Sequence, residues 1–547
     1  MYIRLTRSKK SKHPTIQIVQ GVRDGAKVQQ KIIASLGVIK SPKDLHKLSK
    51  LAEHLIARLE MEGLPQNHRV QVDKLIHKTT IYNGFRKAVA KLMSLTGFAD
   101  VLRAATGKEQ FDVEEVIHLI ISQQLDRPSS KLRTYERQEE HGFFGIDLQH
   151  IYRTMDLVEP LQEAFQKQAF ETAHLFSKQP LDCFFFDVTT LYFESVVQDE
   201  LKNFGFSKDQ KHHSVQIVLA LLVDGRGLPL AYETFAGNLA ETKTLIPVLT
   251  DLRRRLSIRN VTVVCDRGMA SKANIEALKA QEVHYVIASK LRSISQNHRI
   301  NDPSTYSPLP HQEDIPDREK VLFRTLPHPQ YEDTLLISTY SPSRARKDQQ
   351  DRERLLEKLQ TKLSGQAKEA SVKKVMSNSG YKKFTEVQKG SQVTLNEIAI
   401  EEDAAWDGFH GITVSNSSEL TVMEALARYR ELLHVEETFR IAKNNLKARP
   451  MFHWVPRRIK AHVLLCFITL YIERFLEIQL RENGTPISPE KIRHALAGVH
   501  TLYFEDKSVS KTGQMHSQLS LDAKTIFQVL GLSTDRTTTA DESLCCV

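Results

Sequence analysis

Cysteine is scarce in this sequence, with five residues in 547, and long apolar runs are missing. The cysteines show neither metal-ligand spacing nor a disulfide framework, which argues against a disulfide-stapled secreted domain. Residues 1–13 are charged and lack the apolar segment of a signal peptide. The most apolar stretch, 461–472, is too short to span a bilayer and runs into Glu473 and Arg474. We therefore expect a cytoplasmic protein that does not bind a membrane.

The composition allows a large globular core and points to a charged partner. The chain is 41% hydrophobic and 26% charged, close to the average of soluble proteins, and its length predicts about three or four domains. A formal net charge of +10 and a pI near 9.1 favour a polyanionic partner. Charge alone does not identify that partner, because many basic enzymes never bind nucleic acid.

The N-terminal regions are predicted to be a small β meander followed by helices. β-Branched and basic residues mix over 1–40 around turns at Gly21 and Asp24-Gly25. Helical periodicity follows over 41–64 and again over 112–176. No helix-turn-helix motif is apparent. Basic residues of these regions are candidate DNA contacts, and ordinary solvated faces are an equal alternative: Arg4, Arg7, Lys9, Lys10, Lys12, Arg127, Lys131, Arg133, Arg137 and Arg153.

From residue 181 the pattern changes to strands. The first three are predicted to form an antiparallel meander, with the tight turn Asp224-Gly225-Arg226-Gly227 between the second and the third. Helix, strand, helix and strand follow in that order. The predicted strands cover 183–193, 214–223, 228–235, 261–265 and 284–288, and the predicted helices cover 241–256 and 272–280. This order predicts an α/β fold, a ribonuclease H-like mixed sheet flanked by helices.

Residues 289–410 interrupt this series and are predicted to form an inserted domain. They contain two short strand-like segments, 321–324 and 335–339, and a charged helix over 348–363. A strand at 411–414 and helices over 418–446 and 458–480 then return to the core. The expected organisation is a β segment (1–40), a helical region with candidate DNA contacts (41–178), the α/β core in two parts (181–288 and 411–480) around the inserted domain (289–410), and a C-terminal region with a flexible tail (481–547).

Two aspartates stand at strand positions that suggest chemistry. Asp187 follows three phenylalanines within an apolar strand, where a carboxylate is costly to bury unless it is paired or binds a metal. Asp266 ends the buried strand 261–265, and ligands gather at such strand ends. Each has an ordinary alternative. Asp187 could lie on a polar strand face, and Asp266 could cap the next turn.

A third carboxylate follows from helical spacing. Tyr429, Glu436 and Lys443 are seven residues apart, so all three would share one helix face, with Arg440 four residues after Glu436. Glu437 would point about 100° away, which favours Glu436 as the functional acid. The alternative is a solvated face of Glu–Arg and Glu–Lys pairs, the usual meaning of such spacing.

These residues resemble a known family. The run Asp182-Cys183-Phe184-Phe185-Phe186-Asp187-Val188-Thr189-Thr190 resembles the first-Asp strand of DDE transposases from bacterial insertion sequences. Val263-Val264-Cys265-Asp266-Arg267-Gly268-Met269 resembles their second-Asp strand. The run 429–443 resembles the Tyr-Arg-Glu-Lys motif of the branch whose core is split by an inserted domain. The resemblance covers roughly 182–480 and includes Arg449-Pro450 after the motif.

The resemblance implies a metal-dependent transposase. Asp187, Asp266 and Glu436 would be the catalytic residues and would hold two Mg²⁺ or Mn²⁺ ions for cleavage and strand transfer. The partner would be double-stranded DNA, both the terminal inverted repeats, which the helical region 41–178 would bind, and the target DNA. Because two transposon ends must be joined, a homodimer on DNA is a further hypothesis. The implied DNA contacts are Tyr429, Arg440, Lys443 and Arg449.

The sequence departs from the family motif at one position. The motif arginine falls three residues after Tyr429, where this chain has Leu432. This departure leaves the motif's phosphate contacts in question. Two alternatives to a transposase remain open, and Leu432 bears on the second of them. One is a ribonuclease H-like nuclease without strand transfer, which would need neither the inserted domain nor specific ends. The other is a non-catalytic DNA-binding relic, which should have lost at least one acid.

Overall fold

The computed structural model describes most of the chain as two compact units. Described are residues 1–7, 13–24, 27–61, 75–177, 181–205, 213–256, 261–294, 298–364, 379–388, 392–445, 451, 453–506 and 511–534. One unit comprises Met1–Phe165, Asn445–Lys447 and Ala461–Val547, and the other comprises Gln166–Asn444 and Ala448–Lys460. Within the described residues, no helix has the length and apolarity needed to cross a bilayer.

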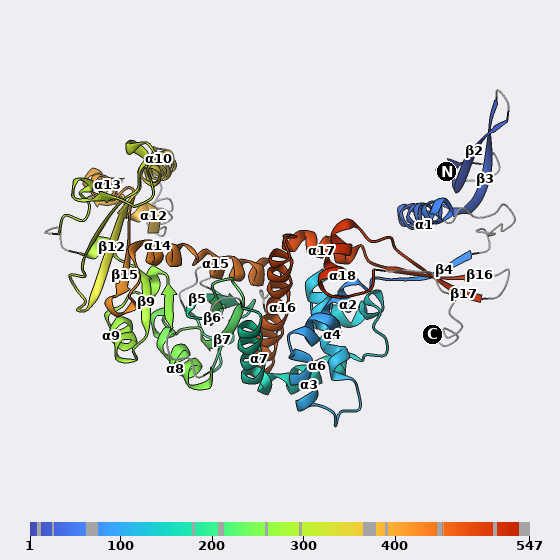
Figure 1. Cartoon of the computed structure of the whole chain (residues 1–547), viewed down its shortest axis with the longest axis horizontal. Helices are drawn as coiled ribbons and strands as arrows, with labels where there is room; N and C mark the ends of the chain where they lie inside the picture. The colour runs from blue at the N-terminus through green and yellow to red at the C-terminus, as the bar shows by residue number, and fades with distance from the viewer. Residues whose placement is uncertain are drawn as a thin grey trace. The chain divides into compact units, whose positions relative to one another are not determined.

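The second unit is built on a nine-stranded mixed sheet with the order β10-β11-β12-β15-β9-β8-β5-β6-β7 (Figure 1). Its first five strands along the chain are β5 (Cys183–Tyr192), β6 (Gln216–Asp224), β7 (Pro229–Ala236), β8 (Thr262–Cys265) and β9 (His284–Ala288). β5, β6 and β7 pair antiparallel, while β8 and β9 run parallel to β5. An antiparallel meander followed by two parallel strands on its first strand is the ribonuclease H-like arrangement. The predicted fold class is therefore confirmed.

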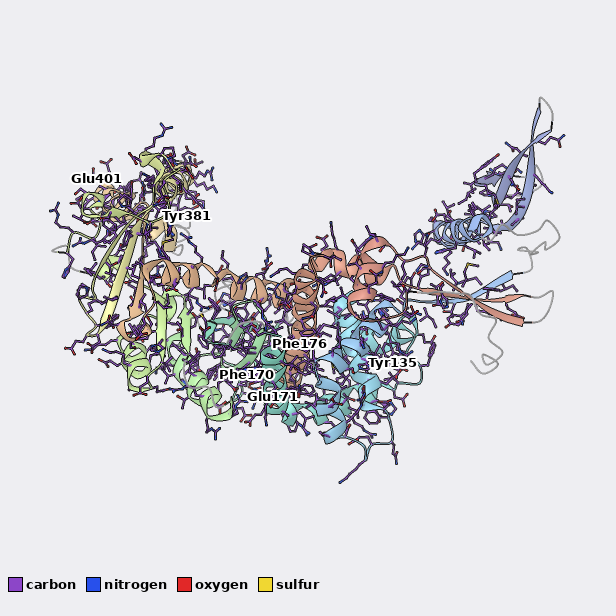
Figure 2. The ribbon with its side chains drawn as sticks, in the orientation of Figure 1. Tyr135, Phe170, Glu171, Phe176, Tyr381 and Glu401 are labelled. Carbon is purple, nitrogen blue, oxygen red and sulfur yellow. The ribbon has the colours of Figure 1, made fainter. Side chains whose placement is uncertain are left out.

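Helices cover both faces of this sheet. The β5 side chains alternate between the faces. Phe184 lies against Phe170 of α7 (Gln162–Leu175), with ring centroids 6.4 Å apart; Phe170 is labelled in Figure 2. α8 (Leu245–Leu256) packs on β7, and α9 (Lys272–Ala280) packs on β9. The face opposite Phe184 carries Cys183, Phe185 and Asp187. It is covered by α14 (Val422–Arg430) and α15 (Leu433–Arg440).

The segment 289–410 extends the core sheet and also carries helices and a small hairpin. β15 (Phe409–Ser415) pairs with β9 on one side and with β12 (Thr334–Tyr340) on the other, and β12 pairs with β11 (Leu322–Pro327), which pairs with β10 (Ser307–Pro308). The further elements are α10 (Pro342–Ser364), α12 (Ser379–Lys382), β13 (Thr385–Gln388), β14 (Gln392–Leu395) and α13 (Glu397–Ala404). β11 and β12 were predicted close to their observed positions, but β10, β13, β14 and the pairing with the core sheet were not.

Buried ion pairs hold the helices of this segment together. The guanidinium of Arg352 on α10 forms two bonds with the Asp407 carboxylate, at 2.5 and 2.6 Å. The side chain of Asp403 at the end of α13 also bonds Arg292 and Lys383. These bonds hold the Asp403 carboxylate ionised, with its pKa below the usual value despite burial. Such two-pronged Arg–carboxylate pairs fix orientation as well as adding energy.

The first unit begins with the predicted β meander, β1 (Tyr2–Thr6), β2 (Thr15–Asp24) and β3 (Lys27–Val38), followed by α1 (Pro42–Met61). The sheet and α1 share a hydrophobic cluster with a C-terminal hairpin, β16 (Thr501–Asp506) and β17 (Lys511–His516), which contributes Leu502 and Met515. β4 (Leu75–Ile81) pairs with β16 across the length of the chain. The sequence analysis did not predict this three-stranded sheet.

Helices make up the rest of the first unit. They are α2 (Gly84–Leu95), α3 (Phe98–Ala105), α4 (Val113–Asp126), α5 (Lys131–Glu136), α6 (Leu148–Val158), α16 (Pro456–Glu482), α17 (Pro489–Ala497) and α18 (Leu521–Val529). α16 was predicted over 458–480 within the catalytic core, but its residues from Ala461 belong to this unit. The physical reason is that α16 makes polar and aromatic contacts with α4 and α3 of the first unit. Gln124 donates to the Cys466 sulfur at 3.0 Å, and Phe98 lies 4.9 Å from Tyr471.

Gly237 marks a close approach of three backbone segments beside β6, and its replacement should destabilise the fold. A Cβ at this position would lie 2.0 Å from the carbonyl oxygen of Gln216 and 2.5 Å from that of Asn203. We expect Gly237→Ala to lower the free energy of unfolding by about 2–3 kcal/mol, as overpacking does. Gly225→Ala is the control, because its Cβ would meet only ordinary contacts at 3.9 Å. Urea unfolding that gives equal midpoints for the two variants would contradict this packing.

Candidate functional site

Asp187 and Asp266 lie side by side on neighbouring parallel strands. The β5–β8 register pairs Phe186 with Cys265, so each aspartate is the next residue along its strand. Paired positions in adjacent strands project to the same face and are about 4.8 Å apart along the hydrogen-bonding direction. Both side chains are half-buried. The two carboxylates therefore meet at the carboxyl end of β8, on the face covered by α14 and α15.

Local hydrogen bonds orient both carboxylates. The backbone N–H of Val188 donates to Oδ1 of Asp187 at 2.7 Å. The backbone N–H of Gly268 donates to Oδ1 of Asp266 at 2.9 Å, so Asp266 caps the short helix that follows β8. The turn-capping alternative for Asp266 is thus realised, and it is compatible with a functional role because the second carboxylate oxygen is not used in the cap.

α14 and α15 pack over these strands. α14 begins at a capping box, in which the Thr421 hydroxyl accepts from the Glu424 N–H and the Glu424 carboxylate bonds back to Thr421. α14 contacts β8, β9 and β15, whereas α15 contacts β5 and β6. The Thr438 hydroxyl donates to the carbonyl oxygen of Gly227 at 3.2 Å and ties α15 to the β6–β7 turn. The two helices thus cross the sheet directly above the aspartates.

The single helix predicted over 418–446 is divided in the structure. At the junction of α14 and α15 the Leu432 N–H donates to the Tyr429 carbonyl at 3.2 Å, and the Val435 N–H donates to the Leu432 carbonyl at 3.2 Å. These three-residue steps tighten the backbone locally. A π-helical turn over Ile441–Asn445 then widens it. The seven-residue spacing therefore does not place Tyr429, Glu436 and Lys443 on one straight line.

Glu436 and Glu437 differ in their surroundings. The Glu437 carboxylate lies 3.3 Å from the Arg440 guanidinium, three residues later on α15. The four-residue pairing of Arg440 with Glu436 that the spacing suggested is not the one formed. Glu436 is exposed, and in the described part of the chain it forms no ion pair. The solvated-pair alternative thus applies to Glu437, and Glu436 keeps an uncommitted carboxylate.

Tyr429 connects the helix to the aspartates. Its half-buried ring lies against His410 of β15, with centroids 5.0 Å apart. Burial raises the pKa of the Tyr429 hydroxyl, and the nearby carboxylates of Asp266 and Glu436 raise it further. Burial likewise raises the pKa of the Cys265 thiol well above its usual value, with added contributions from Asp266 and Asp187. These couplings place the three acids and Tyr429 in one neighbourhood.

The remaining predicted DNA contacts are less clearly placed. Lys443 lies in the π-helical turn with its Nζ 5.9 Å from the centroid of the Phe439 ring. Arg440 is exposed and paired with Glu437. Arg449 lies outside the described residues. A set of at least three His, Cys, Asp or Glu side chains arranged to hold a metal ion is not found among the residues that the structure describes.

Two of the basic residues suggested for DNA binding are interior. Lys131 is 7% exposed, and burial lowers the pKa of its ammonium group to about 8. Arg137 is also 7% exposed, and its guanidinium lies 2.8 Å from Glu140. The sequence pattern misassigned both because it does not report which helix face is covered. Arg127, Arg133 and Arg153 are exposed, whereas Lys9, Lys10 and Lys12 lie outside the described residues.

Three residues near Tyr429 were not singled out from the sequence: His410, Arg267 and Arg344. The charges of both arginines act on the His410 and Tyr429 rings. Arg267 directly follows Asp266, so its position was accessible from the sequence. Arg344 lies in the first turn of α10, and His410 is the second residue of β15. Their proximity depends on the pairing of β12 with β15, which no local pattern reveals.

Comparison with known proteins gives two family matches. The model described as "Transposase DDE domain" matches residues 178–472, more than half of the chain. The model described as "IS1634 family transposase, N-terminal domain" matches residues 3–66. No curated protein matches the sequence.

Solved structures of transposases are similar at low identity. One is a cryo-EM structure of the piggyBac transposase synaptic complex with hairpin DNA, at 9% identity and a TM-score of 0.40, covering 76% of this chain and 78% of that chain. Another is the Mos1 transposase paired-end complex with left transposon end, at 10% identity and a TM-score of 0.15, covering 33% of this chain and 59% of that chain.

Proposed function

Because the chain belongs to the DDE transposases of insertion sequences, we propose that it cuts and rejoins DNA with Asp187, Asp266 and Glu436 as its catalytic carboxylates. The observation that carries this proposal is the register of β5 and β8, which aligns the two aspartates on one face. Glu436 belongs to α15, which packs on that same face. Three oxygen-donor side chains from two strands and a helix suit phosphodiester chemistry.

The donor set fits a divalent cation in part. Carboxylate oxygens are the ligands that Mg²⁺ prefers, and Asp187 and Asp266 are adjacent and half-buried. Glu436 is exposed, and no ion pair with another described residue holds its side chain away from the aspartates. Two bound Mg²⁺ or Mn²⁺ ions would polarise the attacking and leaving oxygens.

The protein's own groups would position the DNA. No covalent enzyme intermediate is needed, because the attacking oxygen belongs first to water and later to a DNA 3′-hydroxyl. It attacks the phosphorus in line with the leaving oxygen, which departs as the new bond forms. A tyrosine hydroxyl is protonated near pH 7, so Tyr429 can donate a hydrogen bond to a phosphate oxygen. Lys443 would be a point charge on the backbone, and Arg440 and Arg449 further phosphate contacts. The terminal repeats would be read by exposed basic residues of the first unit, with two copies of the chain joining two ends.

A plasmid that carries the gene with its native flanks tests this function. With purified protein and Mg²⁺ or Mn²⁺, we expect metal-dependent breaks at the element ends. The breaks should disappear in Glu436→Gln and persist in Glu437→Gln, a matched control one residue away whose partner is Arg440.

Other outcomes would favour the alternatives. Scattered breaks that Glu436→Gln also abolishes would indicate a nuclease without strand transfer. End binding without any break in the unmodified protein would indicate a non-catalytic relic. Equal loss of cleavage in the Glu436 and Glu437 variants would reject Glu436 as the specific third acid.

A further inference from the structure

The cationic surroundings of Tyr429 come from outside the sequence motif. Arg267 follows Asp266 at the end of β8, and Arg344 lies in the first turn of α10. Burial and the positive charges of both arginines lower the pKa of His410 to about 4. The same two charges act against the rise in the pKa of Tyr429. His410 is therefore neutral near pH 7, and the two guanidinium groups carry the positive charge here.

Backbone packing fixes the first turn of α10 beside the strand that carries His410. β12 ends at Tyr340, and the next residue, Ser341, donates its N–H to the Gly408 carbonyl at 3.0 Å. Gly408 has a φ of +81°, and a Cβ there would lie 2.8 Å from the Ala345 Cβ. Only glycine allows this approach. Because His410 contacts Tyr429, α10 delivers Arg344 to the catalytic face.

Among the residues that the structure describes, the one ion-pair partner of Arg344 is distant. The Nε of Arg344 lies 3.8 Å from the Asp348 carboxylate, at the limit of an ion pair, and its side chain is 52% exposed. By contrast, Arg346 lies 2.7 Å from Glu319. Two residues along a helix correspond to a rotation of about 200°, so the two arginines point in nearly opposite directions. Arg344 is thus available to an anion, and Arg346 is a neighbour of equal charge that faces elsewhere.

Leu432 explains why such a cation is needed. The family motif has an arginine at this position, but the Leu432 side chain is only 5% exposed. An arginine with the same orientation would therefore be buried at the start of α15. Without bound metal, the carboxylates of Asp187, Asp266 and Glu436 repel DNA phosphate, so a positive partner from another element would favour a phosphate beside Tyr429.

We propose that Arg344 binds the DNA phosphate that lies beside Tyr429. Arg344 would thus take the place of the motif arginine, since position 432 holds leucine in this chain. This inference rests on the proposed function, since it assigns a role at the same site. It makes the segment 289–410 a contributor to the catalytic centre rather than a separate attachment. A guanidinium suits the role because it donates two parallel hydrogen bonds to a phosphate.

The test compares Arg344→Ala, Arg344→Lys and Arg346→Ala in the full-length protein. Binding to a duplex of the gene's native flank is measured over a range of salt concentrations, without divalent metal. Loss of one phosphate contact should reduce the slope of log affinity against log salt by about 0.9 in Arg344→Ala. Arg344→Lys should restore the slope, and Arg346→Ala should leave it unchanged.

Cleavage at saturating duplex is the second readout. We expect Arg344→Ala to cut about 100-fold more slowly, and Arg344→Lys to recover only part of the rate because lysine lacks the forked geometry. Equal slopes for Arg344→Ala and Arg346→Ala would overturn the proposal. The salt slope needs no catalysis, so it separates failure of this proposal from failure of the transposase chemistry.

Discussion

Asp187→Asn and Asp266→Asn proteins are expected to remain folded and to cleave DNA, in the presence of metal, at a rate lower by about 10³-fold or more. Each substitution removes a charged ligand from a site where bound cations contribute several kcal/mol, and 1.36 kcal/mol corresponds to tenfold in rate. The side-by-side carboxylates also repel each other, so asparagine at either position should not lower the melting temperature of the metal-free protein. Cleavage assays and thermal melts with and without Mn²⁺ measure both effects.

Asp182→Asn is the control for these variants. Asp182 lies just before β5, is exposed, and forms a surface pair with Arg428 at 3.4 Å. Such pairs contribute little, so cleavage and Mn²⁺-induced stabilisation should both survive. An Asp187→Asn protein that cleaves at the normal rate would show that the aligned aspartates are not the catalytic pair. Loss of Mn²⁺ stabilisation in Asp182→Asn as well would show that the metal binds elsewhere.

Breaking the buried ion pair of α16 should cause the largest loss of stability. The Arg474 guanidinium lies 2.6 Å from the Glu477 carboxylate, and the two side chains are 2% and 4% exposed. Glu477→Ala leaves the buried guanidinium without this partner, which should lower the free energy of unfolding by about 3–5 kcal/mol. Urea unfolding of the variant beside the unmodified protein measures the change.

The double variant Arg474→Met/Glu477→Leu separates charge from packing. Replacing both partners with apolar side chains of similar volume removes the uncompensated charge, so stability should return to near that of the unmodified protein. If the double variant is as unstable as Glu477→Ala, the pair contributes mainly through shape. Arg133→Ala serves as an exposed control, since Arg133 and Glu136 form a surface pair at 2.8 Å.

Local patterns in the sequence predicted most of the core elements. The apolar runs around Asp187 and Asp266 became β5 and β8, and the order of strands and helices predicted the ribonuclease H-like sheet. These predictions succeeded because strand periodicity and tight turns depend on residues that are close in the chain. The roles of the predicted site residues remain predictions, and the experiments above address them.

Long-range pairing was beyond such patterns. Two strands of the segment 289–410, β11 and β12, were predicted, yet their addition to the core sheet through β15 was not. β4 and β16 pair from opposite ends of the chain. The alternation of side chains along a strand shows which residues share its buried face. It does not show which other strand will pair with its edge.

The sequence by itself determined the family, the meander and its parallel strands, and the positions of Asp187 and Asp266 within them. Only the tertiary structure decided that Arg440 pairs with Glu437 rather than Glu436, that Leu432 is buried, and that the first turn of α10, which carries Arg344, packs beside the start of β15. The physical reason is that helix and strand propensities act between near neighbours in the chain. Charge pairing, burial and phosphate access depend instead on distances in space, which are set when α14, α15 and α10 pack on the sheet.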